Sequence, residues 1–160
     1  MIGPPPGEGF GQHEFHPQGS LLGVNLYSVK DRIIEHIGDA EMGFEVDLEE
    51  EIYPIKGNSV YFTYGANPCL AGVLFDKKKK LWIFHNSHLS DEQVAAINNC
   101  IGGIVGGGLW AIDEYSYLLK ESKANVITPT VTSSSFGIAV VTKKVKDVPV
   151  GIFYGYSEIS

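Results

Sequence analysis

Cys69 and His85 are the residues of this chain whose types and spacing could perform nucleophilic chemistry. Cys69 stands at the start of one apolar run, and His85 stands at the end of the next. An imidazole beside a thiol can accept its proton and stabilise the thiolate, which is the form that attacks a carbonyl carbon. The pair therefore indicates a hydrolase or transferase that forms a covalent intermediate on sulfur.

The two apolar runs are expected to form an antiparallel hairpin, because the polar stretch Asp76 to Lys80 separates them. If that stretch is the loop, the opposed pairs are Phe75 with Leu81, Ala71 with His85 and Cys69 with Ser87. Opposed residues share a face, so Cys69 and His85 become diagonal neighbours, roughly 7 Å apart between backbones. His88 would face away, although a slip of one residue or a bulge would exchange the two histidines.

Catalysis by such a pair also needs a group that holds the imidazole in one tautomer. The hydroxyl of Thr63, at the end of the preceding strand, can serve. The turn that leads into Cys69 can present backbone amides to a developing oxyanion. The predicted catalytic residues are therefore Cys69, His85 and Thr63, and the sequence assigns no substrate-binding residues.

Two alternatives remain open. An unpaired cysteine in an apolar strand is usually inert core, and a histidine at a strand end is usually a polar boundary. In that case the chain is a non-catalytic protein-binding module, whose Trp82 and Trp110 are plain core. The other alternative is a different thiol hydrolase, or a transglutaminase, that uses the same dyad.

The pattern of the whole chain predicts an α+β fold, with a layered, β-sandwich-like sheet core and flanking helices. Strands are expected at Ser59–Tyr64, Cys69–Phe75, Leu81–His85, Asn125–Ile127, Gly137–Thr142 and Val150–Tyr156. Helices are expected at Val29–Ile37, from a Ser90 capping box to about Ile101, and at Asp113–Lys120. Clustered strands followed by alternating helices and strands favour this layered fold over a doubly wound parallel sheet.

Four other segments complete the organisation. Residues 1–20 are rich in Gly and Pro and are expected to be a flexible N-terminal arm, followed by a single catalytic domain over residues 21–160. Residues 45–53 are acidic, which is typical of a solvated face or loop. Residues 102–110 are dense in glycine but lack the Lys-Ser/Thr of a phosphate loop, so we expect a strand approached closely by other backbone. Thr128 to Ser135 is expected to be a loop.

The composition of the chain limits which kinds of partner and which cellular compartments we expect for it. The 160 residues have a formal net charge of -7, and Lys77 to Lys80 is the one dense basic run, which argues against nucleic acid as a partner. Two cysteines are too few for a disulfide framework. No stretch is long enough for a membrane span, and no secretory signal pattern is visible, so we expect a cytoplasmic protein or one secreted into a host cell without a classical signal peptide. The histidines at 13 and 16 lack further ligands at zinc-like spacing, so no metal is expected.

Residues 63–76 read TYGANPCLAGVLFD, and residues 82–85 read WIFH. This pattern resembles the core of the chemoreceptor glutamine deamidase (CheD) family. In that family a Thr six residues before a Cys is followed by an apolar strand, a turn and a His on the next strand. The same arrangement occurs in the related deamidase toxins, cytotoxic necrotizing factor and Burkholderia lethal factor. The resemblance covers residues 58 to about 111.

The resemblance implies that Cys69 is the nucleophile, His85 the general base and acid, and Thr63 the orienting residue. It also implies a fold like that of these deamidases and a reaction that converts a glutamine side chain of a target protein to glutamate and releases ammonia. A bacterial toxin or virulence effector is one expected setting, and no cofactor is required. The chain departs from the pattern at Pro68, where the toxins have Gly, and at residues 81–84, where Leu-Trp-Ile-Phe replaces the Gly-Gly-Met-Ala of the chemotaxis enzymes.

Overall fold

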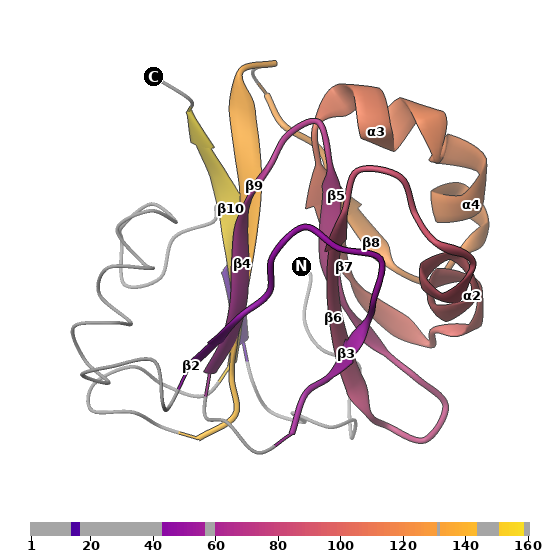
Figure 1. Ribbon diagram of the computed structural model, residues 1–160, viewed down its shortest axis with the longest axis vertical. Helices are drawn as coiled ribbons and strands as arrows, with labels where there is room; N and C mark the ends of the chain where they lie inside the picture. The colour runs from indigo at the N-terminus through magenta and orange to yellow at the C-terminus, as the bar shows by residue number, and fades with distance from the viewer. Residues whose placement is uncertain (1–13, 17–42, 57–59, 131, 144–150, 159–160) are drawn as a thin grey trace.

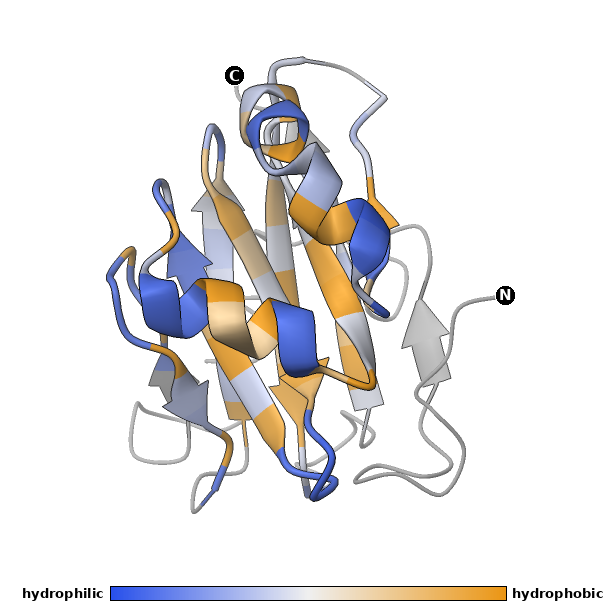
Figure 2. Ribbon diagram, turned by 90° about the vertical axis from the view of Figure 1, so that its right-hand side faces the viewer, coloured by the Kyte–Doolittle hydropathy of each residue, from blue (hydrophilic) through white to orange (hydrophobic). Residues whose placement is uncertain are grey.

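The computed structural model describes residues 14–16, 43–56, 60–130, 132–143 and 151–158. Within these ranges the strands form two five-stranded sheets, and three helices cover the outer side of one of them (Figures 1 and 2). This arrangement agrees with the expected α+β architecture of sheets with flanking helices. The expected helix at Val29–Ile37 lies outside the described residues.

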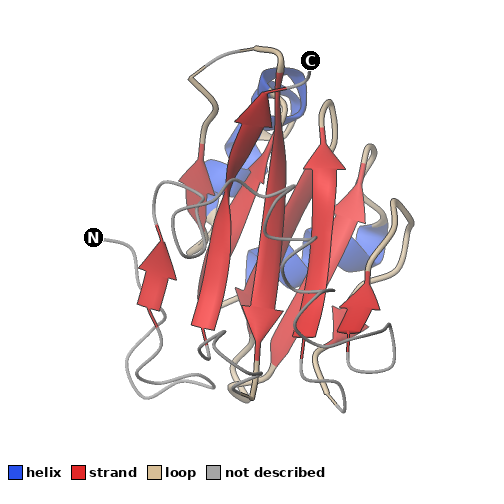
Figure 3. Ribbon diagram, turned by 90° about the vertical axis from the view of Figure 1, so that its left-hand side faces the viewer, coloured by secondary structure: helices blue, strands red, loops and turns tan. Residues whose placement is uncertain are grey.

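The first sheet has the strand order β1-β10-β9-β4-β2 and is seen face-on in Figure 3. Its strands are β1 (Glu14–His16), β2 (Gly43–Glu45), β4 (Val60–Ala66), β9 (Ser134–Val141) and β10 (Gly151–Glu158). The long central strands β4, β9 and β10 pair antiparallel, whereas the short strands β1 and β2 add in parallel at the two edges.

The second sheet has the order β3-β6-β5-β7-β8. Its strands are β3 (Tyr53–Pro54), β5 (Leu70–Phe75), β6 (Leu81–Asn86), β7 (Gly102–Gly107) and β8 (Asn125–Ile127). The helices are α2 (Asp91–Asn99), α3 (Leu109–Glu114) and α4 (Ser116–Glu121). None of the described helices is long and apolar enough to cross a membrane.

The β5–β6 hairpin has the register that the sequence predicts. Ala71 pairs with His85 and Phe75 with Leu81. The ladder ends at the pair of Leu70 with Asn86, so Cys69 lies just before the strand and is not part of the ladder. The short polar turn sets this register, because Asp76 accepts hydrogen bonds from the backbone amides of Lys78 and Lys80 at 2.8 and 2.9 Å.

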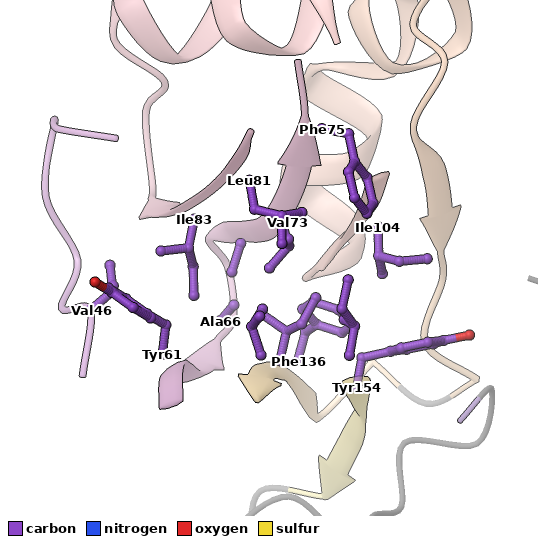
Figure 4. Packing of buried hydrophobic residues seen from close by; sticks show 14 of the residues in the cluster. Val46, Tyr61, Ala66, Val73, Phe75, Leu81, Ile83, Ile104, Phe136 and Tyr154 are labelled. Atoms are coloured by element: carbon purple, nitrogen blue, oxygen red, sulfur yellow. The ribbon is translucent and has the colours of Figure 1, made fainter. Parts of the chain in front are cut away.

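Two apolar layers follow from the alternation of side chains along the central strand β5. Ala71, Val73 and Phe75 point between the sheets, where they belong to a cluster that also includes Phe136 and Tyr154 of the first sheet (Figure 4). Leu70 and Leu74 point to the opposite face and pack beneath the helices. Because both faces of β5 are buried, its sequence is apolar throughout.

Local signals locate α2 and β7 as expected. Ser90 accepts a hydrogen bond from the Gln93 amide, and the Gln93 side chain accepts one from the Ser90 amide, which is the predicted capping box. The helix ends at Asn99, two residues before the expected Ile101, and Cys100 is its C-cap. In β7, a Cβ on Gly103 would lie 2.4 Å from the Val73 carbonyl oxygen, so this strand is indeed approached closely by other backbone.

Three expectations differ from the structure. The helix expected at Asp113–Lys120 is two short helices separated at Tyr115, whose hydroxyl accepts a hydrogen bond from the Leu89 amide. Strand β9 begins at Ser134, inside the segment expected to be a loop. Glu14–His16 of the expected loose arm forms an edge strand, since backbone pairing with β10 needs no side-chain periodicity. The rest of residues 1–20 lies outside the described part of the chain.

We predict that Gly103→Ala lowers the free energy of unfolding by ~2–3 kcal/mol, because the added methyl group meets main-chain atoms of β5 that cannot move aside cheaply. Gly65→Ala is the matched control: its Cβ would have no atom within 4 Å, and only the strain of its positive φ of 75° would cost about 1 kcal/mol. Urea unfolding of both variants measures the difference. Equal losses would contradict the close approach of β5 and β7.

Candidate functional site

The three predicted catalytic residues converge from both sheets on the interior. Thr63 lies in β4 of the first sheet, His85 lies in β6 of the second, and Cys69 precedes β5. Their exposed fractions are 1%, 5% and 5%, so all three residues are buried. Cys69 belongs to the apolar cluster between the sheets, on the face that Ala71 and its partner His85 share.

A hydrogen bond of 2.7 Å joins Thr63 Oγ1 to His85 Nδ1. The same hydroxyl donates to the Val46 carbonyl oxygen at 2.6 Å. Because a hydroxyl has one proton to give, Thr63 must accept from His85, and Nδ1 carries the hydrogen. The imidazole is thereby held as the tautomer whose Nε2 has the lone pair.

The other imidazole nitrogen, Nε2, carries the lone pair of the neutral ring. Within the described residues His85 Nε2 is buried and has no hydrogen-bond partner. Burial lowers the pKa of His85, and the negative charge of Asp47 opposes this effect and raises it. The net pKa is lower than the ordinary value of 6.5, so the ring is neutral at pH 7 and its Nε2 can accept a proton.

The Cys69 thiol does not hydrogen-bond His85 in this structure. Burial raises the pKa of Cys69 above the ordinary 9.0, and the backbone amides of Cys69 and Asn67 lower it by less. The resting pair is therefore a neutral thiol and a neutral imidazole. The sequence led us to expect a thiolate stabilised by the histidine, and the low-polarity interior is the physical reason for the difference.

The chain around Cys69 is held by backbone contacts on both sides. The β4–β9 ladder shifts its register between Thr63 and Ala66, which turns the chain out of the sheet. Asn67 then donates through Nδ2 to the Ser134 and Thr132 carbonyl oxygens at 2.6 and 3.1 Å. Pro68 contributes no amide hydrogen, so the amides that flank it are those of Asn67 and Cys69.

Glycines let β7 approach the other side of Cys69. The Gly108 amide donates to the Cys69 carbonyl oxygen at 3.1 Å. A Cβ on Gly107 would lie 2.1 Å from that same oxygen, so no larger residue fits there. The glycine-dense stretch thus fixes the position of the Cys69 main chain.

Two contributors to the site carried no sequence signal. The acidic segment that was expected to be a solvated loop is bound to the site through its backbone: besides Val46, the Glu49 amide donates to the His85 carbonyl oxygen at 2.8 Å. The buried Gln93 side chain holds this segment by donating to the carbonyl oxygens of Glu49 and Glu51 at 2.9 and 3.0 Å. Backbone groups can do this from any residue type, so the sequence could not reveal them.

Tyr156 is the second contributor that the sequence missed. From β10 its hydroxyl reaches across to the second sheet, where it accepts from the Gly107 amide at 3.0 Å and lies 2.5 Å from the Ile127 carbonyl oxygen. Burial raises the pKa of Tyr156 to about 12, so the hydroxyl stays neutral at physiological pH. Tyr156 thereby fixes the strand that lies against Cys69.

The remaining candidates lie apart from the site. The side chain of His88 is 74% exposed and stands 3.8 Å from Glu114, so it faces away from Cys69 as expected. Cys100 is a buried, unpaired thiol beneath α2. In the described part of the chain no group of three His, Cys, Asp or Glu side chains is placed to hold a metal ion. Residue 13 of the histidine pair at 13 and 16 lies outside the described residues.

We predict that Thr63→Val lowers the free energy of unfolding by ~2 kcal/mol, because it leaves the buried Val46 oxygen and His85 Nδ1 without their partner. Thr63→Ser keeps the hydroxyl and should restore most of the loss. Denaturant unfolding gives the energies, and nitrogen NMR shifts of His85 report the tautomer. A wild-type ring protonated on Nε2 would contradict the assignment.

We also predict that His85 makes stability fall with acid. Its pKa in the folded chain is lower than the 6.5 of an ordinary histidine, so the unfolded chain binds more protons between the two values. This contribution to stability is complete above pH 6.5 and decreases as the pH falls below it. Unfolding of the wild type and of His85→Gln across this range isolates the effect; parallel pH profiles would contradict it.

No family model, curated protein or solved structure matches the chain. The resemblance to the glutamine deamidases therefore stays an interpretation of the sequence.

Proposed function

We propose that this chain is a cysteine-dependent protein glutamine deamidase, with Cys69 as nucleophile, His85 as general base and acid, and Thr63 as the residue that orients His85. The observation that carries the proposal is the hydrogen bond between Thr63 Oγ1 and His85 Nδ1. It reserves Nε2 for proton transfer, in a site that also contains a thiol. These are the parts that acyl transfer through sulfur requires.

In the proposed reaction, the Cys69 thiol gives its proton to His85 Nε2 as sulfur attacks the carboxamide carbon of a target glutamine. The oxygen of that carboxamide becomes negative, and we assign the backbone amide of Cys69 to its stabilisation, since that amide already lowers the pKa of the thiol. His85 then protonates the departing nitrogen. Ammonia leaves, and a thioester remains on Cys69.

Water completes the cycle. It loses a proton to His85 Nε2 as it attacks the thioester carbon, and the C–S bond breaks. The proton returns to the sulfur, and the target side chain leaves as glutamate. Both partners of the dyad start and end neutral, which fits a site whose burial raises the pKa of Cys69 and lowers that of His85.

The proposal gives the protein a target protein as its partner and needs neither cofactor nor metal. Conversion of glutamine to glutamate adds one negative charge to the target, a change that suits control of signalling or the action of a bacterial toxin or effector. The deamidase-like identity of the fold, and a cytoplasmic or host-cell location, belong to the same proposal. Other thiol hydrolases and transglutaminases would use the dyad in the same way. An added amine distinguishes a transglutaminase, which joins the amine to the target, from a deamidase, which leaves glutamate.

The deep burial of Cys69 and His85 favours a second candidate, the non-catalytic binding module. In that case the thiol is plain core, as its membership of the apolar cluster allows. This candidate requires that Cys69→Ala and His85→Ala leave every binding property of the chain intact, and that Cys69 has no special reactivity.

We predict that a peptide carrying 6-diazo-5-oxonorleucine, an electrophile shaped like glutamine, labels Cys69 and not Cys100. The attack needs His85 as base, so His85→Ala should slow labelling at pH 7 at least tenfold. Mass spectrometry of peptides from the labelled chain counts both thiols at once, which makes Cys100 the internal control.

The pH profile of that labelling distinguishes the candidates. Base catalysis by His85 predicts a rate that rises through a pKa below 6.5, whereas an unassisted thiol reacts only as pH exceeds 9.0. If Cys69 and Cys100 react at the same rate in the wild type and in His85→Ala, the deamidase proposal fails.

A further inference from the structure

A surface groove lies between α2 and the turn of the β5–β6 hairpin. Two adjoining cavities of about 250 Å³ and about 330 Å³ form it, and they share Asp76, Trp82 and Asn99. Figure 1 shows this turn at the opposite end of β5 from the loop that precedes the strand. At about 3.3 Å per residue, Cys69 and Asp76 are separated by roughly 23 Å along the strand. The groove is therefore distinct from the site around Cys69.

The inner part of the groove is apolar. Leu74 and Phe75 line it, and Trp82, which pairs with Leu74 and shares its face, is partly buried beside them. Ala95 and Ala96 of α2 form the wall, and their small side chains leave the space open. A cavity of about 250 Å³ is smaller than the ~300–1,000 Å³ of most small-molecule pockets, but it can receive one large side chain.

The outer part of the groove is basic. Lys77, Lys78 and Lys80 line it, and all three are exposed. With Lys79, they are four of the 12 Lys and Arg residues in a chain whose formal net charge is -7. Neighbouring like charges repel, so this turn concentrates a positive potential that an anionic partner would relieve.

We propose that this groove binds a segment of a partner protein in which one large apolar side chain is flanked by Asp or Glu residues. The apolar side chain enters the cavity against Trp82, and the carboxylates meet the three lysines. Glu92 and Asp76 line the apolar part, so the acidic residues of the segment must lie toward the lysine turn. The inference concerns binding alone and does not depend on the reaction proposed for Cys69.

A protein segment fits the groove better than a small anion does. The lysines are exposed, and the charged groups that line the inner cavity are carboxylates, which would repel an anion placed there. An apolar centre with an exposed charged rim is instead the usual anatomy of a protein interface. The charged rim then contributes mainly to the rate of association and to specificity.

The groove contains its own reporter. The chain has two tryptophans, and Trp110 is 52% exposed on α3, outside the residues that line the groove. In a Trp110→Phe background, Trp82 emission therefore reports occupancy. The probes are the acetylated peptide amides Glu-Asp-Leu-Glu-Glu, Lys-Lys-Leu-Lys-Lys and Glu-Asp-Ser-Glu-Glu, titrated at low salt. The acidic leucine peptide should saturate the signal and bind at least tenfold more tightly than either of the other two.

Charge reversal tests the rim. In the Trp110→Phe background, the affinity for the acidic leucine peptide should fall at least tenfold when three substitutions are combined, Lys77→Glu, Lys78→Glu and Lys80→Glu. The matched control reverses three exposed lysines elsewhere, Lys120, Lys123 and Lys143, for the same change in net charge, and should change affinity by less than twofold. Circular dichroism of both triple variants checks that the fold is intact.

Three results would overturn the proposal. One is that the acidic and basic leucine peptides bind with equal affinity, or that Trp82 emission does not saturate at millimolar peptide. Another is an equal loss of affinity in the two triple variants. The third is self-association: residues 47–51 of this chain read DLEEE, with Leu48 51% exposed, and could occupy the groove of a second copy. In that case Trp82 emission would depend on protein concentration without any peptide, and charge reversal of the groove lysines would abolish this dependence. The occupant of the groove would then be a second copy of the chain.

Discussion

The hydrogen bond between Thr63 and His85 is the interaction on which the arrangement of this molecule depends. It is a buried polar contact between two sheets that meet mainly through apolar side chains. Removing one partner would leave a buried polar atom without its hydrogen bond, at a cost of ~1–3 kcal/mol. The strand ladders on both sides must therefore keep Thr63 and His85 opposite each other, and the Val46 carbonyl completes the hydroxyl's contacts.

The same burial that makes this contact strong opposes charge at the site. It raises the pKa of Cys69 and lowers that of His85, so an ion pair of thiolate and imidazolium is disfavoured at rest. In the proposed reaction, transfer of the thiol proton would therefore have to accompany the attack of sulfur on the substrate. The backbone amides near the sulfur, and the carboxylate of Asp47 near His85, are the described groups that favour the charged forms.

The parts of the site that the sequence predicted depend on short-range rules. A polar turn of known length sets the pairing of Ala71 with His85, and a capping box sets the start of α2. The features that the sequence did not predict depend on backbone groups or on pairing between strands that are far apart in the sequence. The Val46 carbonyl could belong to any residue, and the assignment of β4 and β5 to different sheets depends on β9, some seventy residues further along the chain. Residue types alone do not encode such contacts.

Two polar contacts between the sheets flank the strand that leads from Cys69. Thr63 holds β6 through His85, and Tyr156 holds β7 and β8 through Gly107 and Ile127. Since β5 lies between β6 and β7, the position of Cys69 follows from the spacing of the sheets on both sides. Close packing makes that spacing hard to change, because the interior has little free volume. The position of Cys69 is therefore coupled to the first sheet, although Cys69 leads into a strand of the second.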